Sequence, residues 1–219
     1  MTRSRNRGSL TRPTPRREPY DRVLIVCEGS KTEPNYLKEL VAHYRLSSAN
    51  IQITGEGGAA PNSVVGYAIE LFKKDPDYDR VYCVFDRDGH PTFHAAVQQV
   101  QDKRLIRRNG RKKIGEAHFE AITSIPCFEY WILLHFRETT AHMSRFADLL
   151  PYMRKVPELC MYEKGARGLF GVTHAQLDAA LDRADRANRA AAVACTDNPT
   201  TRMPELIRYL LQLAKKKSR

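Results

Sequence analysis

RVLIVCEGSKTEPNYL, residues 22–37, joins a short apolar run to a polar loop. The run from Val23 to Cys27 has five apolar residues in succession, which is typical of a strand buried on both faces of a parallel sheet. Glu28 follows this run directly, and Lys31 comes three residues later. Because open parallel sheets bind ligands beyond the carboxyl ends of their strands, the carboxylate at this point is a candidate functional group.

An alternation of strand and helix patterns continues from this segment to about residue 140. We expect strands at about 22–28, 50–54 and 116–125 and a third strand that ends on acids within 79–90, and helices at about 33–46, 62–74, 91–107 and 126–136. Thr32 is the expected N-cap of the first helix, which has Pro34 in its first turn. This order predicts an α/β fold in which helices flank both faces of a mostly parallel sheet.

The two ends of the chain differ from this alternating part. Residues 1–20 are rich in Arg, Ser, Thr and Pro, so we expect a disordered basic tail. Beyond about residue 140 we find no strand pattern, and helical patterns occupy about 142–156, 174–194 and 203–217. The predicted organisation is a tail, an α/β domain over 21–140, and a helical region over 141–219 that packs on that domain.

Composition argues against several classes of protein. No apolar run approaches the roughly 20 residues that span a bilayer, and the polar N-terminus lacks a signal-peptide core. The five cysteines form no C-x-x-C pair, which argues against a zinc knuckle or a redox motif. We therefore expect a cytoplasmic protein with reduced thiols and no membrane association. The sequence leaves the oligomeric state open.

Positive charge is concentrated at both ends and in one internal cluster. The net charge is +11, and residues 1–22 and 215–219 account for all but +2 of it. The internal cluster is KRLIRRNGRKK, residues 103–113, expected at the end of the third helix. Its basic residues are Lys103, Arg104, Arg107, Arg108, Arg111, Lys112 and Lys113. They indicate either a solvated helix end or a nucleic-acid contact, and a nearby site for phosphate chemistry would favour the contact.

A second apolar strand pattern also ends on acidic residues. In VYCVFDRDGH, residues 81–90, Asp86 and Asp88 follow the apolar run. If this strand neighbours the first, Glu28 joins them at one edge of the sheet. Each acid alone could be a helix cap. Clustered carboxylates resist ionisation unless a cation compensates, so the three together predict a site for Mg²⁺ or Mn²⁺, ions that promote phosphodiester cleavage.

Five motifs together resemble a known family. They are VCEGSKTEPNY at 26–36, VFDRDGH at 84–90, SIPCFEYWILLHF at 124–136, YEKG at 162–165 and NPTT at 198–201. The first two resemble the TOPRIM domain, and the whole set resembles the RloB-like (AbiLii-like) abortive-infection family.

The resemblance implies a TOPRIM-type, metal-dependent nuclease that acts as a toxin in bacterial anti-phage defence, with an AAA-type ATPase encoded nearby as its partner. RNA such as tRNA is favoured over DNA as the substrate. The resemblance also implies that Glu28 acts as general base or acid and as a metal ligand, and that Asp86 and Asp88 hold the metal.

Three further residues are candidates for the same site. Glu129 lies within the apolar segment CFEYWILL, where an unpaired carboxylate is costly, so it needs either a metal or a structural salt bridge. Lys164 and Lys31 could stabilise charge on the scissile phosphate, or could be ordinary surface lysines. No D-x-D-x-D pattern follows Asp86, so a second metal would need Glu129 or Glu33.

Two other interpretations stay open. VYCVFDRDG also resembles the first motif of haloacid-dehalogenase-type phosphatases, with Asp86 as the nucleophile and Asp88 as the acid. A full β-α-β unit precedes the motif here, and no later strand ends in paired acids, which both count against a phosphatase. The remaining interpretation is a non-catalytic module that binds nucleic acid or an ATPase.

Overall fold

The computed structural model describes residues 21–48 and 50–217. The predicted disordered tail over 1–20 lies outside the described residues. None of the helices in the described part is long and apolar enough to cross a membrane.

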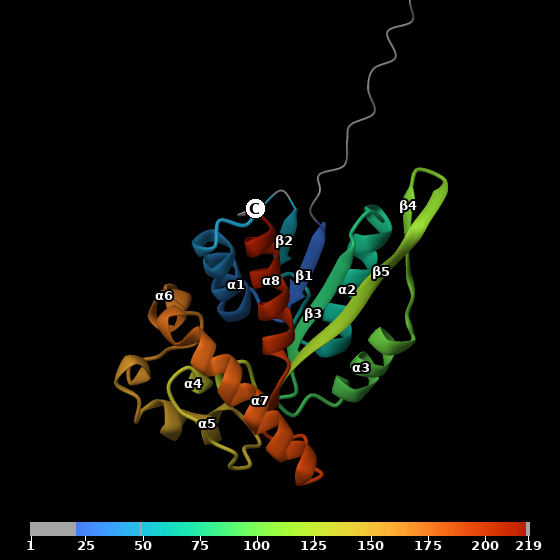
Figure 1. Ribbon diagram of the computed structural model, residues 1–219. Coiled ribbons are helices and arrows are strands. Elements are labelled where there is room, and N and C mark those ends of the chain that lie inside the picture. Colours follow the sequence, from blue (N-terminus) through green and yellow to red (C-terminus); the bar gives the residue numbers. More distant parts are fainter. Residues whose placement is uncertain (1–20, 49, 218–219) are drawn as a thin grey trace, which may run out of the picture.

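A six-stranded sheet forms the centre of the molecule (Figure 1). Its strands are β1 (Val23–Cys27), β2 (Ile51–Thr54), β3 (Arg80–Asp86), β4 (Leu105–Asn109), β5 (Lys112–Ile125) and β6 (Thr200–Thr201). The order is β2-β1-β3-β5-β4, and β6 pairs with β5. Strands β2, β1, β3 and β5 are parallel, whereas β4 and β6 run antiparallel to β5. The predicted α/β fold with a mostly parallel sheet is therefore confirmed.

Helices cover both faces of this sheet (Figure 1). They are α1 (Thr32–His43), α2 (Pro61–Lys74), α3 (Phe93–Asp102), α4 (Glu129–Leu134), α5 (Phe146–Met153), α6 (Leu169–Thr173), α7 (Leu177–Val193) and α8 (Met203–Lys217), with 3₁₀ turns η1 (Pro157–Leu159) and η2 (His174–Gln176). One apolar core joins α2 and α3 to the sheet, and the other joins α1 and the helices from α4 onward to the opposite face. The C-terminal helices thus share a core with the sheet.

The apolar pattern explains which strands occupy the middle of the sheet. All five residues of β1 are buried, because helices cover the strand on both sides. Strand β1 lies between β2 and β3, so β1 and β3 are neighbours as the convergence of the acids requires. Register partners Cys27 and Val84 lie near the carboxyl ends of both strands, which therefore finish at the same edge.

The predicted helix over 91–107 is wrong at its C-terminal end. The helix α3 stops at Asp102, and the next residues form β4, which pairs antiparallel with β5. Strand β5 is longer than predicted and begins at Lys112. The Asn109–Gly110 turn is a hairpin signal between two strands, and Gly110 has a φ of +58° that suits glycine. The run of basic residues resembles a helix end when the sequence is considered alone. It forms a strand because it pairs with β5, and such tertiary pairing outweighs local preference.

Two smaller expectations are also corrected. Thr32 is the first residue of α1, and the N-cap position belongs to Lys31, which makes no capping bond. The Thr32 hydroxyl instead accepts a hydrogen bond from the backbone N–H of Gly165 at 3.0 Å. The two-residue strand β6 is too short to leave a pattern in the sequence, and exists because it pairs with the end of β5.

Candidate acidic active site

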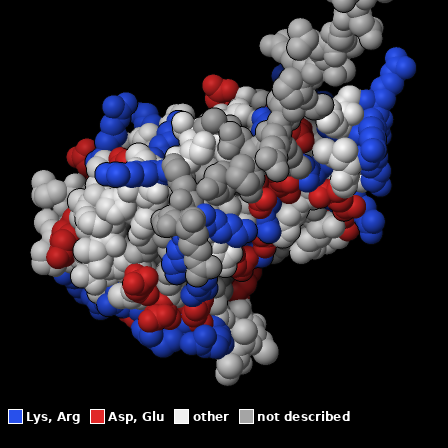
Figure 2. All heavy atoms as spheres, turned by 45° about the horizontal axis from the view of Figure 1, so that its top comes forward, with Lys and Arg blue, Asp and Glu red and all other residues white. Residues whose placement is uncertain are grey.

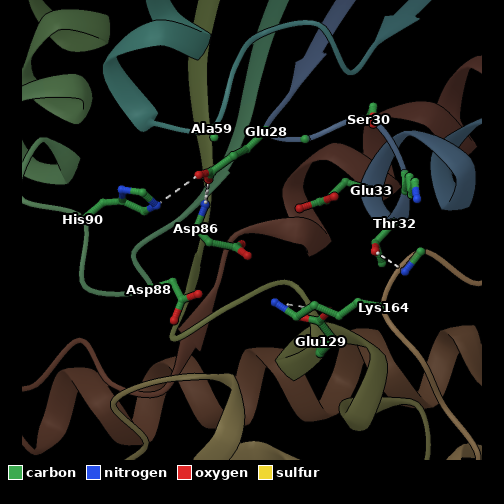
Figure 3. Close-up of a pocket in the computed structure, with 13 residues that line it drawn as sticks. Glu28, Ser30, Thr32, Glu33, Ala59, Asp86, Asp88, His90, Glu129 and Lys164 are labelled. Carbon is green, nitrogen blue, oxygen red and sulfur yellow. Dashed lines mark hydrogen bonds and ion pairs between the residues drawn. The ribbon is translucent and has the colours of Figure 1, made fainter.

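A cavity of about 320 Å³ opens at the carboxyl ends of β1 and β3 (Figure 3). The cavity contains every residue that the sequence suggested for catalysis or metal binding. These are Glu28, Lys31, Asp86, Asp88, Glu129 and Lys164. Glu33 and His90 line the same space. Five carboxylates from β1, α1, the end of β3 and α4 are thus gathered around one opening.

Glu28 is held in place from two sides (Figure 3). One carboxylate oxygen, Oε2, accepts a hydrogen bond of 2.9 Å from the backbone N–H of Asp86. The other, Oε1, lies 3.4 Å from Nε2 of His90, a contact that the sequence did not predict. Gly29 has a φ of +69°, which lets the chain turn away directly after this residue. Burial raises the pKa of Glu28 above the ordinary value, and the Asp86 N–H offsets part of that rise.

The bend after β3 brings the second pair of acids to the cavity. The backbone N–H of Arg87 donates to the carbonyl oxygen of Ser124 at 3.1 Å, and that of Asp88 donates to the carbonyl oxygen of Pro126 at 3.0 Å. Asp88 has a positive φ of 24°, so its side chain leaves the line of the strand. Asp86 and Asp88 therefore both reach the cavity although they are two residues apart, as Figure 3 shows.

Burial and neighbouring carboxylates raise the pKa values of two acids in this group. Burial raises the pKa of Asp86 well above its ordinary value, and the charges of Glu33, Glu129 and Glu28 raise it further. Glu33, in the first turn of α1, has a pKa raised to about 7, again by burial first and by Glu129 and Glu28 second. The protein thus keeps acids together that favour the neutral form, an arrangement typical of functional sites.

Glu129 has the salt bridge that was one of the two explanations the sequence left open, and a hydrogen bond beside it. It begins α4, its side chain is 3% exposed, and Oε1 accepts a hydrogen bond of 2.9 Å from the hydroxyl of Tyr162. Lys164 Nζ lies 3.9 Å from the same oxygen and 4.6 Å from the ring centroid of Phe146. Partial burial opposes the charged form of Lys164, but the surrounding acids, Glu129 foremost, outweigh this effect and raise its pKa.

The YEKG motif is a strap that carries Lys164 to the cavity. The backbone N–H of Gly165 donates to Thr32, which ties the strap to the first turn of α1. Gly165 has a φ of +85°, and a Cβ there would approach Lys31 Cδ to 2.9 Å, so only glycine fits without displacing Lys31. The strap therefore brings Lys164 and Lys31 to the same side of the opening.

The NPTT motif has a structural role. The Asn198 side chain donates to the carbonyl oxygen of Met143 at 2.6 Å and accepts from its backbone N–H at 3.2 Å. The hydroxyls of Thr201 and Ser124 lie 3.0 Å apart where β6 meets β5. The motif fixes the C-terminal helices to the carboxyl end of β5, and its residues do not line the acidic cavity.

The donor set suits a hard cation, although no coordination shell is preassembled. Within residues 21–48 and 50–217, no group of three or more His, Cys, Asp and Glu side chains is close enough to hold a metal ion as the side chains stand. The cavity nevertheless offers carboxylate oxygens, which Mg²⁺ and Mn²⁺ prefer, and its acids have raised pKa values that a cation would relieve. The residues fit such an ion in chemistry and charge, and ligation would require their side chains to rotate.

The basic cluster is not brought to this cavity. It forms the β4–β5 hairpin, at the opposite end of the sheet from the carboxyl ends of β1 and β3 (Figure 1). Arg107 is mostly buried, with its guanidinium 2.6 Å from Asp79 and 3.5 Å from Asp77. The other six basic side chains of the cluster are exposed. The proximity that would favour a nucleic-acid contact next to the acids is therefore missing.

Comparison with known proteins gives one finding. A family model described as RloB-like protein matches residues 23–210. No curated protein and no solved structure gives a significant match. The matched range begins with β1 and ends within α8, and so includes both the acidic cavity and the basic hairpin.

Proposed function

The chain belongs to the RloB-like protein family, and from this premise we propose that it is a metal-dependent nuclease with a TOPRIM-type catalytic site. The observation that carries the proposal is the convergence of Glu28, Asp86 and Asp88 at the carboxyl ends of two neighbouring strands, with Lys31 and Lys164 at the same opening. Acids and lysines together suit a phosphodiester, because the substrate is an anion that both a metal and an ammonium group attract.

In this proposal Glu28, Asp86 and Asp88 hold Mg²⁺ or Mn²⁺ through carboxylate oxygens. When bound, the ion would polarise the phosphodiester and neutralise charge on the leaving oxygen. Glu28 is suited to accept a proton from the attacking water, because burial raises its pKa towards the range of an effective general base. The N–H of Asp86 fixes the orientation of Glu28 for that step.

The lysines act on the phosphate. Lys164 is half exposed and is placed by Glu129 and by the ring of Phe146, so its ammonium group can meet an anion at the rim of the cavity. The hydroxyl of Tyr162 holds Glu129 in turn. Glu129 is therefore a positioning residue in this proposal, and Lys164 the group that stabilises charge on the scissile phosphate.

The biological setting of the proposal rests on the family resemblance of the motifs. We propose that the nuclease is an effector of anti-phage abortive infection, that it works in the cytoplasm beside an AAA-type ATPase, and that it cleaves RNA such as tRNA in preference to DNA.

The proposal is tested with a metal-dependence assay. End-labelled tRNA, total RNA and plasmid DNA are incubated with the protein, alone and with the ATPase, in Mg²⁺, Mn²⁺ or EDTA. Cleavage should require a divalent ion and should fall by about 10³-fold in Glu28→Gln, which cannot take up the proton. Glu70→Gln, an exposed glutamate on α2, is the matched control and should cleave at the native rate.

Four results would contradict the proposal. Cleavage that persists in EDTA, or that is equal in Glu28→Gln and Glu70→Gln, would place the chemistry elsewhere. Hydrolysis of p-nitrophenyl phosphate without any cleavage of nucleic acid would favour the phosphatase, with Asp86 as nucleophile. Toxicity in cells that survives Glu28→Gln, together with retained ATPase binding, would favour the non-catalytic module.

A further inference from the structure

The β4–β5 hairpin carries a dense positive charge on a projecting arm. No acidic residue occurs between Asp102 and Glu116, and seven of the eleven residues from Lys103 to Lys113 are basic. Six of these seven are exposed, Arg107 being the exception. Lys and Arg side chains form the blue column at the right of Figure 2. No acidic residue accompanies these exposed cations in the segment, so the hairpin suits a polyanionic partner.

The base of the arm is fixed to the body of the protein. Arg107 binds Asp79 and Asp77, and the backbone N–H of Arg108 donates to the carbonyl oxygen of Pro76 at 2.9 Å. The turn at Gly110 and the residues after it extend beyond these contacts. The arm is therefore anchored at its base and presents its charges in a set direction.

A groove continues the positive surface from the hairpin onto the body. It has a volume of about 290 Å³ and lies between α2 and the start of β4. Its basic lining residues are Lys73, Lys103, Arg104 and Arg108. Arg104 has one weak partner, Glu116 at 4.0 Å, and its side chain is 81% exposed. Because Lys103, Arg104 and Arg108 belong to the basic cluster and also line the groove, the two positive surfaces adjoin.

The length of β5 sets the separation between the arm and the acidic cavity. Asp86 is the register partner of Ser124, which lies eleven residues along β5 from Lys113. At roughly 3.3 Å per residue, Lys113 lies at most about 36 Å from the carboxyl end of β3, and the turn at Gly110 and Arg111 lies beyond it. A B-form duplex advances about 3.4 Å per base pair and an A-form RNA duplex advances less, so the gap corresponds to on the order of ten base pairs or slightly more.

We propose that the β4–β5 hairpin is a distal docking arm for the phosphate backbone of an extended, base-paired RNA. Exposed Lys and Arg bind phosphates by releasing condensed counterions, which needs no base readout and no deep pocket. The prediction that docked RNA is cleaved at the acidic cavity rests on the proposed nuclease function, whereas the prediction that the hairpin binds RNA does not. The arm selects for a substrate that reaches on the order of ten base pairs from the cleaved bond, and leaves shorter RNA to bind at the cavity alone.

The first experiment measures binding without cleavage. Fluorescence anisotropy in EDTA follows labelled stem-loop RNAs with stems of about 24 and about 6 base pairs, over a range of salt concentrations. The hairpin variant is R111E/K112E/K113E, and the matched control is K38E/K155E/R189E, three exposed basic residues outside the arm. The hairpin variant should bind the long stem at least about tenfold more weakly, and the slope of log affinity against log salt should fall by about three. Binding of the short stem should be unchanged.

Two binding results would overturn the docking arm. Equal losses in the hairpin variant and the control would show that net charge alone carries binding. Native affinity of the hairpin variant for the long stem would show that the arm does not touch RNA. Circular dichroism of both variants checks that the sheet is intact.

Cleavage is measured separately, so that the two proposals can fail independently. In Mg²⁺ the hairpin variant should lose about tenfold or more in kcat/KM on the long stem and nothing on the short one, because the acidic cavity is untouched. If the native protein cleaves neither RNA but the hairpin still governs binding, the nuclease proposal fails and the docking arm stands. If the native protein cleaves both and the hairpin variant cleaves both equally well, the docking arm fails and the nuclease stands.

Discussion

The acidic cavity and the basic hairpin each concentrate charges of one sign, but the cavity partly buries its charges and the hairpin exposes them. The cavity gathers carboxylates from three segments that are far apart in the sequence, and partly buries them. The hairpin carries its cations in one continuous segment and leaves six of the seven in solvent.

Burial makes the difference between the two regions. In the cavity, burial and neighbouring charges raise the pKa values of Glu28, Glu33 and Asp86, so the arrangement lowers stability unless a cation arrives. Solvent screens the exposed charges of the hairpin, which costs little and permits loose contact with a polyanion. A buried cluster therefore suits chemistry, and an exposed cluster suits docking.

Asp86→Asn should have a larger effect than the two comparisons that follow, and it should lower cleavage while it raises stability. If Asp86 is a metal ligand, nucleic-acid cleavage should fall by at least about 100-fold. The variant should be more stable than the native protein at pH 8. The raised pKa of Asp86 means that the native protein loses stability as the pH rises above the ordinary carboxyl pKa, whereas asparagine cannot ionise. Near pH 4 the acid is protonated in the folded state and about half protonated in the unfolded state, so most of the advantage should be lost.

Thermal unfolding at pH 4 and pH 8, with and without Mg²⁺, measures this effect. Mg²⁺ should raise the Tm of the native protein and have a smaller effect on Asp86→Asn. A variant less stable than the native protein at pH 8 in EDTA would show that Asp86 is not under electrostatic strain.

Tyr162→Phe and Tyr67→Phe compare a buried tyrosine–carboxylate hydrogen bond with an exposed one. Removing the hydroxyl leaves Glu129 buried without its donor, so the unfolding free energy should fall by about 1–3 kcal/mol. The matched control is Tyr67→Phe, whose hydroxyl donates to Glu56 at 2.8 Å on the surface and whose loss should leave the Tm unchanged. Urea unfolding of both variants measures the difference, and equal losses would show that burial at the cavity is unimportant.

Arg107→Gln and Arg111→Gln compare two arginines of the same hairpin, and we expect their effects to be the smallest. Arg107 is mostly buried against Asp79, so its loss should lower the unfolding free energy by about 1–2 kcal/mol and leave the salt dependence of RNA binding unchanged. Arg111 is exposed at the turn, so its loss should leave the Tm unchanged and lower the salt slope by about one. Thermal unfolding and anisotropy separate the two roles, and similar behaviour of both variants would contradict the division between anchor and tip.

The residues of the acidic cavity were more predictable from the sequence than the structure of the basic hairpin was. Glu28 and Asp86 each follow an apolar run, and a parallel sheet brings such ends together once the strands are neighbours. Glu129 was also predictable, because a carboxylate in an apolar segment must have a partner. The partners themselves, Tyr162 and His90, were not predictable, since a contact between distant segments leaves no local pattern.

The hairpin shows why local patterns fail. Residues 103–113 have a helix-like end and a hairpin-like Asn-Gly turn, and the sequence alone does not rank the two. Pairing of Leu105 with Ala117, both buried, decides for the strand. The same pairing places the basic residues at the end of the sheet that is away from the acids. The distribution of charge along the sequence did not indicate this position.

The sequence by itself determined the α/β alternation, the acids at two strand ends and the identity of the basic cluster, because each is written in consecutive residues. Only the tertiary structure decided that the six candidate residues line one cavity, that Lys164 arrives on a strap tied to α1, and that the basic arm stands at the opposite end of the sheet. Those facts depend on strand order, register and the direction of chain bends, which are set by packing between segments remote in the sequence.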